Sequence, residues 1–121
     1  MTIHREHPFL PPEPERNPVR RFRGRLASGV AVWTSAYDDR PAGLTVSSML
    51  VADGEPARLL ALLDPDSELW DTAARARTVA VSLLGWDHRQ LADAFAGVAP
   101  APGGPFRMAN WQHSRWGPVL D

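Results

Sequence analysis

Three hydroxyl side chains lie close together in an otherwise mostly apolar stretch of the sequence: Thr45, Ser47 and Ser48. If this stretch is an extended strand, Thr45 and Ser47 share one face and Ser48 points to the other. Hydroxyl groups near a buried strand need hydrogen-bond partners, because unpaired buried polar groups are costly. Two interpretations follow from the spacing, and it favours neither. The hydroxyls bind nearby backbone, or they line a polar ligand site.

A second group of interest is the run from Asp64 to Ser67, which precedes a segment with helix-forming residues. The first turn of a helix has free backbone N–H groups and a favourable dipole, both of which suit a phosphate, and Ser67 could add a hydroxyl. The simpler interpretation is an ordinary capped helix, with Asp66 as the capping residue. The carboxylates of Asp64, Asp66 and Glu68 also disfavour an anion unless they turn away.

Standard catalytic patterns are absent from the sequence. It contains no glycine-rich phosphate loop, no nucleophile elbow and no pair of histidines on one helical turn. His88 and His113 are isolated and read more simply as surface histidines than as general bases. The sequence therefore predicts neither a catalytic side chain nor a metal site.

The composition limits the class of protein. A chain of 121 residues suits one domain, and a net charge of -1 argues against nucleic-acid binding. No apolar run approaches 18 residues, and the N-terminus lacks the apolar core of a signal peptide. With no cysteine there is no disulfide framework. We therefore expect a cytoplasmic protein that does not span a membrane.

The order of elements favours an α+β, mainly β fold. Residues 1–16 are rich in proline and predict a flexible arm, and residues 17–121 are expected to form one domain. Three successive strands with hairpin-length connections argue against a doubly wound parallel sheet and favour an antiparallel barrel. The predicted elements are a helix from Asn17 to Gly29, strands at 30–36, 42–51 and 58–63, a helix from 64 to about 77, a strand at 78–84, a helix at 87–96, and mostly irregular structure over 98–118.

Several segments resemble, in the expected order, the flavin reductase-like proteins with an FMN-binding split barrel. This resemblance implies an antiparallel Greek-key split β-barrel with flanking helices. It also implies that residues 17–121 are the N-terminal two-thirds of such a domain, which leaves the barrel incomplete at the C-terminus. The matching segments are Ser28–Thr34, Gly43–Ser48, Leu62–Asp64 with Ser67, Ala80–Gly85, Leu91–Gly97 and Gly117–Leu120.

The resemblance implies an NAD(P)H-dependent flavin reductase that binds FMN or FAD, takes hydride from NADH or NADPH, and is a homodimer. Such reductases supply reduced flavin to a partner monooxygenase. Two alternatives stay open: a split-barrel module that holds flavin or haem without turnover, and an inactive truncated fragment. Relatives continue through further strands and carry a Gly-Arg pair and a histidine that help with nicotinamide.

Carried over by position, the resemblance also assigns the cofactor-binding residues. Thr45, Ser47 and Ser48 would contact the ribityl chain and ring edge, and Val46 would contribute backbone groups. Ser67 would approach the phosphate from the loop that begins at Asp64. The sequence departs from the family pattern at Leu69, where a further hydroxyl is frequent, and at Ala94, where a basic residue is frequent.

Overall fold

The computed structural model describes Pro18 and residues 29–121. The predicted arm at 1–16, and all of the predicted first helix except Pro18 and Gly29, lie outside the described residues. The elements are β1 (Val30–Tyr37), β2 (Arg40–Val46), β3 (Leu50–Ala52), β4 (Arg58–Leu60), α2 (Glu68–Ala76), β5 (Ala80–Leu84), a short 3-10 helix η2 (Trp86–His88), α3 (Arg89–Phe95), a second 3-10 helix η3 (Pro105–Met108), β6 (Trp111–Gln112) and β7 (Val119–Leu120).

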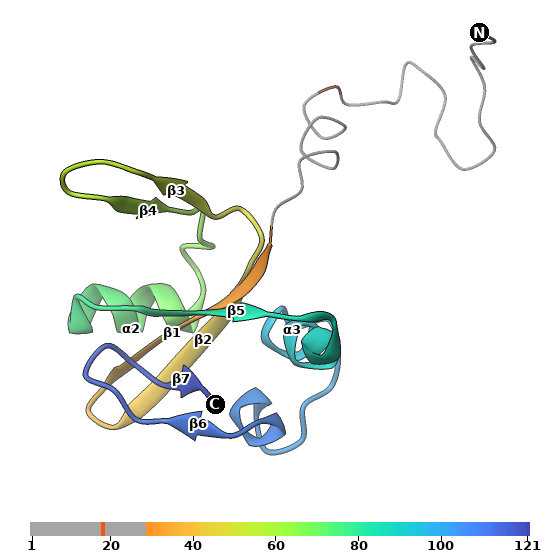
Figure 1. Ribbon diagram of the computed structural model, residues 1–121. Helices are drawn as coiled ribbons and strands as arrows, with labels where there is room; N and C mark the ends of the chain where they lie inside the picture. The colour runs from red at the N-terminus through yellow and green to blue at the C-terminus, as the bar shows by residue number, and fades with distance from the viewer. Residues whose placement is uncertain (1–17, 19–28) are drawn as a thin grey trace, which may run out of the picture.

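The central sheet has the strand order β2-β1-β5, and both of its pairings are antiparallel. Two smaller antiparallel sheets, β3-β4 and β6-β7, complete the described strands, and the β3-β4 hairpin projects away from the central sheet (Figure 1). The predicted mainly β class is therefore confirmed. The predicted Greek-key barrel is not seen as a closed structure, because the described strands form three separate sheets.

Strand β1 is buried on both faces, and its alternating side chains face two separate cores. Ala31 and Trp33 pack with Leu69 of α2 in one core. Val32, on the opposite face, packs with Leu91 and Phe95 of α3 in the other. The two helices therefore cover opposite faces of the central sheet, and the near-continuous apolar sequence of β1 reflects this double burial.

The predicted strand at 42–51 is wrong as a continuous element. β2 starts at Arg40, after a two-residue turn at Asp38 and Asp39 with φ of 50° and 59°, and it ends at Val46. Val46 is opposite Ala31, so only one further residue of β1 could pair with the strand. The chain then bends at Ser47 and resumes at Leu50 as β3, which pairs with β4 instead.

The helix starts also differ in detail from the sequence-based expectation. Ser67, and not Asp66, is the N-cap of α2, and its side chain accepts a hydrogen bond from the backbone N–H of Trp70. The helix predicted over 87–96 begins instead as the 3-10 helix η2 and continues as α3 from Arg89, and no side chain caps either of them. Gly97, with φ of 75°, follows the end of α3 as predicted.

The segment after α3 is mostly irregular, as predicted, but it contributes an aromatic cluster. The rings of Phe95, Phe106 and Trp111 meet edge to face, with centroids 4.9 to 5.7 Å apart. Such pairs add to the stabilisation from burial. Within the described part of the chain, no helix is both long and apolar enough to cross a membrane.

Gly43 has a steric reason to lack a side chain. A Cβ at this position would lie 2.6 Å from Cε1 of Phe95, whose buried ring is held in the aromatic cluster. We expect Gly43→Ala to lower the free energy of unfolding by about 1–3 kcal/mol, the usual cost of overpacking a core. Chemical denaturation followed by tryptophan fluorescence measures this change.

Gly29→Ala is the matched control, since a Cβ at Gly29 would meet no atom of the described residues within 4 Å. Its stability should stay close to that of the wild type. Equal losses in the two variants would contradict the steric explanation.

Candidate functional site

The end of β2 places the predicted hydroxyl residues at an edge of the core. Val46 is only 2% exposed and packs with Trp33 and Leu69. Ser47 directly follows it and is exposed, whereas Ser48 is half-buried. The chain therefore leaves the sheet through Ser47–Met49, directly after the buried residue Val46.

Ser48 binds the backbone of the segment that follows β4. Its hydroxyl donates to the carbonyl oxygen of Leu62 at 3.1 Å and accepts from the N–H of the same residue at 3.0 Å. This pairing replaces the ladder hydrogen bonds that an unbroken strand would make. For Ser48, the structure confirms the interpretation in which the hydroxyl binds nearby backbone.

Thr45 also binds backbone, on the opposite side of the sheet from α2. Its hydroxyl donates to the carbonyl oxygen of Ala92 in α3 at 2.6 Å. A hydroxyl keeps two acceptor lone pairs after it donates its proton, so this bond does not exclude a ligand contact. The bond does, however, give Thr45 a structural role in holding α3 to β2.

The start of α2 is organised by Asp64 and Ser67. The carbonyl oxygen of Asp64 accepts from the Ser67 hydroxyl at 2.7 Å and from the Ser67 N–H at 3.1 Å. The carboxylate of Asp64 accepts from the N–H of Asp66 at 2.9 Å. The Ser67 oxygen in turn accepts from the N–H of Trp70 at 3.2 Å.

The fold brings the two predicted segments together, although they are separate in the sequence. Val46 and Leu69 belong to one buried cluster, and Met49 and Leu63 pack against it. The Ser48 hydroxyl, between Val46 and Met49, is hydrogen-bonded to the backbone of Leu62, next to Leu63. Thus the Thr45–Ser48 and Asp64–Ser67 segments border the same core, as a shared ligand site requires.

The electrostatics of this region are mixed. The first turn of α2 carries Glu68 and Asp71, and its last turn carries Arg75. Acidic side chains near the N-terminus stabilise the helix but oppose a phosphate bound there. An anion at this end of α2 would therefore depend on backbone N–H groups of the first turn, since the Ser67 hydroxyl donates to the carbonyl oxygen of Asp64. Leu69, in the same turn, is completely buried.

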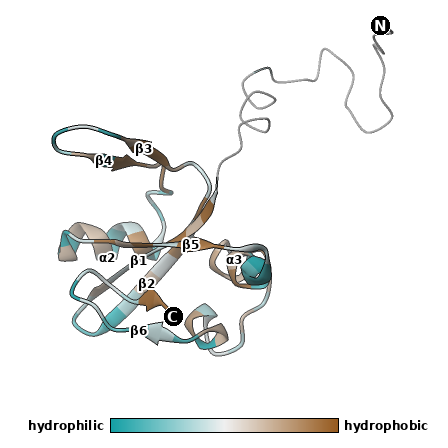
Figure 2. Cartoon of the chain, viewed as in Figure 1, coloured by the Kyte–Doolittle hydropathy of each residue, from teal (hydrophilic) through white to brown (hydrophobic). Residues whose placement is uncertain are grey.

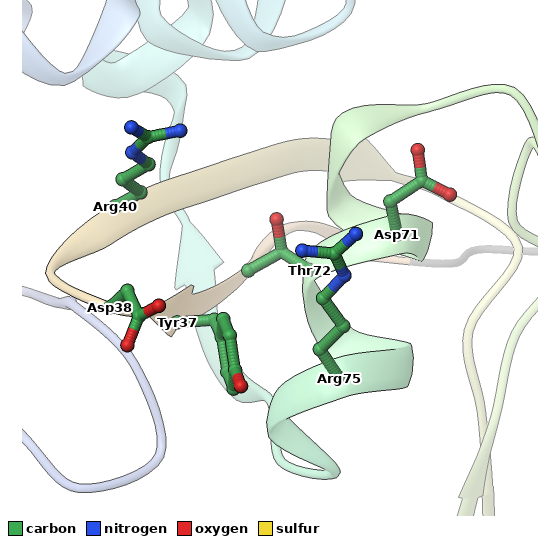
Figure 3. A pocket seen from close by; sticks show the side chains of 6 residues that line it. All are labelled: Tyr37, Asp38, Arg40, Asp71, Thr72 and Arg75. Atoms are coloured by element: carbon green, nitrogen blue, oxygen red, sulfur yellow. The ribbon is translucent and has the colours of Figure 1, made fainter.

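Two surface hollows lie elsewhere, near the β1-β2 turn, and sequence reasoning did not predict either. The first, of about 390 Å³, lies between that turn and α2 (Figure 3). The second, of about 400 Å³, includes His113, Arg115 and Pro118 from the β6-β7 connection. The only signal for them in the sequence is the turn chemistry of Asp38 and Asp39. Neither hollow contains a predicted flavin-binding residue. The first is lined by Tyr37, Asp38, Arg40, Asp71, Thr72 and Arg75.

This fold, with a three-stranded antiparallel sheet between α2 and α3, is shared with solved structures of flavin reductases. The model of the flavin reductase like domain matches residues 23–120. The chain therefore belongs to the flavin reductase-like family.

Known relatives and structures agree with this assignment. The chain is 31% identical over 102 residues to the reductase component of 4-nitrophenol 4-monooxygenase/4-nitrocatechol 2-monooxygenase from Rhodococcus opacus, covering 84% of this chain and 53% of the relative. It is 33% identical over 84 residues to the NADH-dependent FMN reductase AsuE2 from Streptomyces nodosus subsp. asukaensis, covering 69% and 45%. The chain thus spans about half the length of these relatives.

Among solved structures, the NADH:FAD oxidoreductase SgcE6 of Streptomyces globisporus C-1027 superposes with a TM-score of 0.70 at 25% identity, covering 92% of this chain and 66% of the other. The flavin reductase PheA2 superposes with a TM-score of 0.72 at 21% identity, covering 85% and 65%. At that identity the second match shows the fold alone.

Thr45 offers a direct test of its bond to α3. Thr45→Val removes the hydroxyl and leaves the carbonyl oxygen of Ala92 without that donor. We expect the free energy of unfolding to fall by about 1 kcal/mol, the usual net contribution of such a bond. Urea denaturation measures the change, and Thr45→Ser, which keeps the hydroxyl, should lose less. An unchanged Thr45→Val variant would show that the bond contributes nothing to stability.

Proposed function

We propose that this chain binds FMN and belongs to an NADH-dependent flavin reductase that supplies reduced flavin to a monooxygenase. The observation that carries the proposal is the convergence of the Thr45–Ser48 and Asp64–Ser67 segments on one core within a chain of this family. Relatives named as an NADH-dependent FMN reductase and as a monooxygenase reductase component support it. FAD and NADPH are the alternatives for the two cofactors.

The residues present fit a flavin in chemical terms. Thr45, Ser47 and Ser48 offer hydroxyls, Val46 offers backbone groups near the surface of the core, and Ser67 caps a nine-residue helix. In our proposal the ribityl chain and ring edge lie along Thr45–Ser48. The phosphate approaches Ser67 and the free N–H groups of the first turn of α2.

A bound flavin would supply the hydride-transfer chemistry with a nicotinamide, and residues of this chain would bind and orient it. This division of work agrees with the absence of recognised catalytic motifs from the sequence. The part assigned to this chain is to present hydroxyl and backbone donors in a fixed geometry. The buried anchor at Val46 and the Asp64–Ser67 hydrogen bonds provide that geometry.

Purified protein tests the proposal directly. We expect FMN to bind, as shown by isothermal titration calorimetry and by the flavin absorbance of the complex. NADH oxidation that depends on added flavin would establish reductase activity in this chain. FMN binding without NADH oxidation would favour the non-catalytic module, and the absence of any binding would refute the proposal.

Ser47 is the sharpest single-residue probe of the site. If its hydroxyl donates to flavin, Ser47→Ala should weaken FMN binding by about 1–2 kcal/mol, the scale for a neutral hydrogen bond whose partner is left unpaired. Ser35→Ala is the control. It removes a hydroxyl at the other end of β1, away from the proposed site, where Ser35 donates to the carbonyl oxygen of Thr78. Calorimetry measures both affinities. Unchanged FMN affinity in Ser47→Ala would remove this residue from the site.

We further propose that two copies of this chain form a homodimer through the β3-β4 hairpin. The hairpin exposes Leu50 and Val51 at 63% each, and Leu59 and Leu60 at 48% and 50%. The strands of this projecting hairpin are coloured as hydrophobic residues near its base (Figure 2). A two-stranded hairpin is marginally stable alone, and burial of these side chains against a second copy would stabilise it.

A charge on the hairpin tests the proposed homodimer. Leu50→Glu should shift the protein from dimer to monomer in sedimentation velocity experiments, because it places a charge in an apolar interface. Val98→Glu changes a similarly exposed side chain, 74% exposed, in the segment after α3 and should leave the dimer intact. A wild-type monomer, or a dimer that survives Leu50→Glu, would contradict the proposed interface.

A further inference from the structure

Ser48 connects the end of β2 to the start of α2 through a short series of hydrogen bonds. It holds both backbone groups of Leu62, at 3.1 and 3.0 Å. Only Leu63 separates Leu62 from Asp64, whose carbonyl oxygen accepts from the Ser67 hydroxyl and N–H. A shift of Leu62 can therefore reach Ser67, the N-cap of α2, through Leu63 and Asp64.

The same segment has few other restraints on its exposed side. Asp64, Pro65 and Asp66 are exposed, and Leu62 is 85% exposed, so its side chain contributes little to anchoring. Leu63 is half-buried and packs against the Val46 cluster. The segment is therefore held to the rest of the fold by two contacts, the hydrogen bonds of Ser48 to Leu62 and the apolar packing of Leu63.

The Ser48 hydroxyl has one proton, and that proton is donated to the carbonyl oxygen of Leu62. It cannot donate the same proton to a ligand without giving up this bond. The oxygen also accepts from the Leu62 N–H, which leaves one lone pair for any further contact. The geometry therefore favours an indirect action of Ser48 over a direct donation to the flavin ring.

We infer that Ser48 is a positioning residue for the phosphate end of the flavin, acting through the segment from Leu62 to Ser67. This inference rests on the proposed flavin binding and assigns a different role to one of its residues. Loss of the Ser48 hydroxyl frees Leu62, loosens the Asp64–Ser67 turn and so displaces the backbone N–H groups of the first turn of α2. The ring end of the ligand, along Thr45–Ser47, keeps its contacts.

FMN and riboflavin distinguish the two roles, because they differ only in the phosphate. In Ser48→Ala we expect the dissociation constant for FMN to rise about five- to tenfold, the equivalent of one lost hydrogen bond, and that for riboflavin to change less than about twofold. Ser48→Thr keeps the hydroxyl and should restore most of the FMN affinity. Isothermal titration calorimetry with both flavins measures these values in the wild type and in each variant.

Ser114 provides a matched control in the β6-β7 connection. Its hydroxyl is also bound twice to nearby backbone, donating to the carbonyl oxygen of Gly117 at 2.5 Å and accepting from the N–H of Trp116 at 3.2 Å. Ser114→Ala should leave the FMN-to-riboflavin affinity ratio unchanged. If Ser48→Ala does not fold, Ser48→Cys keeps the side-chain volume with weaker hydrogen bonds, and the same ratio is measured in it.

The outcomes separate this inference from the proposed function. A wild type that binds neither flavin refutes both. Equal weakening of FMN and riboflavin in Ser48→Ala means that Ser48 contacts the ring end, and this overturns the positioning role while flavin binding stands. Unchanged FMN affinity, or a Ser48→Thr variant as weak as Ser48→Ala, overturns it as well.

Discussion

The pairing of β1 with β2 ends at Ala31 and Val46, and the candidate site depends on this end. With only Val30 left in β1, the chain leaves the sheet and must satisfy its backbone elsewhere, because buried N–H and C=O groups need partners. It does so through β3-β4 and through the Ser48 hydroxyl, which binds a residue 14 positions further along. The same exit brings the Asp64–Ser67 segment to the edge of the core beside Val46.

Hydroxyl groups secure the opposite end of β1 in a similar way. Thr34 and Ser35 are both fully buried, and each donates its hydroxyl to a carbonyl oxygen, Pro118 for Thr34 at 2.5 Å and Thr78 for Ser35 at 2.7 Å. Gly117 packs directly on this part of the strand, where a Cβ would lie 2.9 Å from Cα of Ser35. Buried polar groups that are hydrogen-bonded cost little free energy. The two hydroxyls can therefore hold the segments at Pro118 and Thr78 against β1 without disrupting the apolar cores on its two faces.

The sequence predicts most of the elements, because their signals are local. β1, the two helices and the glycine that follows α3 all have periodic or capping patterns within a few residues. The single strand predicted at 42–51 failed for a non-local reason. Its residues all suit a strand, and the break at Ser47 arises from the length and register of β1. The N-cap of α2 lies one residue after the predicted Asp66, a choice decided by the turn that Asp64 forms.

The candidate site could be located from the sequence, but the roles of its residues could not. A hydroxyl in a strand pattern looks the same whether its partner is a ligand or a carbonyl group from a distant segment. Only the fold shows that the Thr45 hydroxyl meets α3 and that the Ser48 hydroxyl meets Leu62. The two hollows at the β1-β2 turn were also missed, since they arise where the turn, α2 and the β6-β7 connection approach one another.

Most residue types in the Gly43–Ser48 segment are explained by the fold itself. Gly43 makes room for Phe95, Thr45 ties β2 to α3, Val46 closes the core, and Ser48 holds the segment after β4. Each of these structural roles restricts which residue type can occupy the position, whether or not a ligand binds. Ser47 directly follows the buried Val46 and is exposed. Since four of these positions serve the fold, a match to this segment is stronger evidence for the family than for turnover.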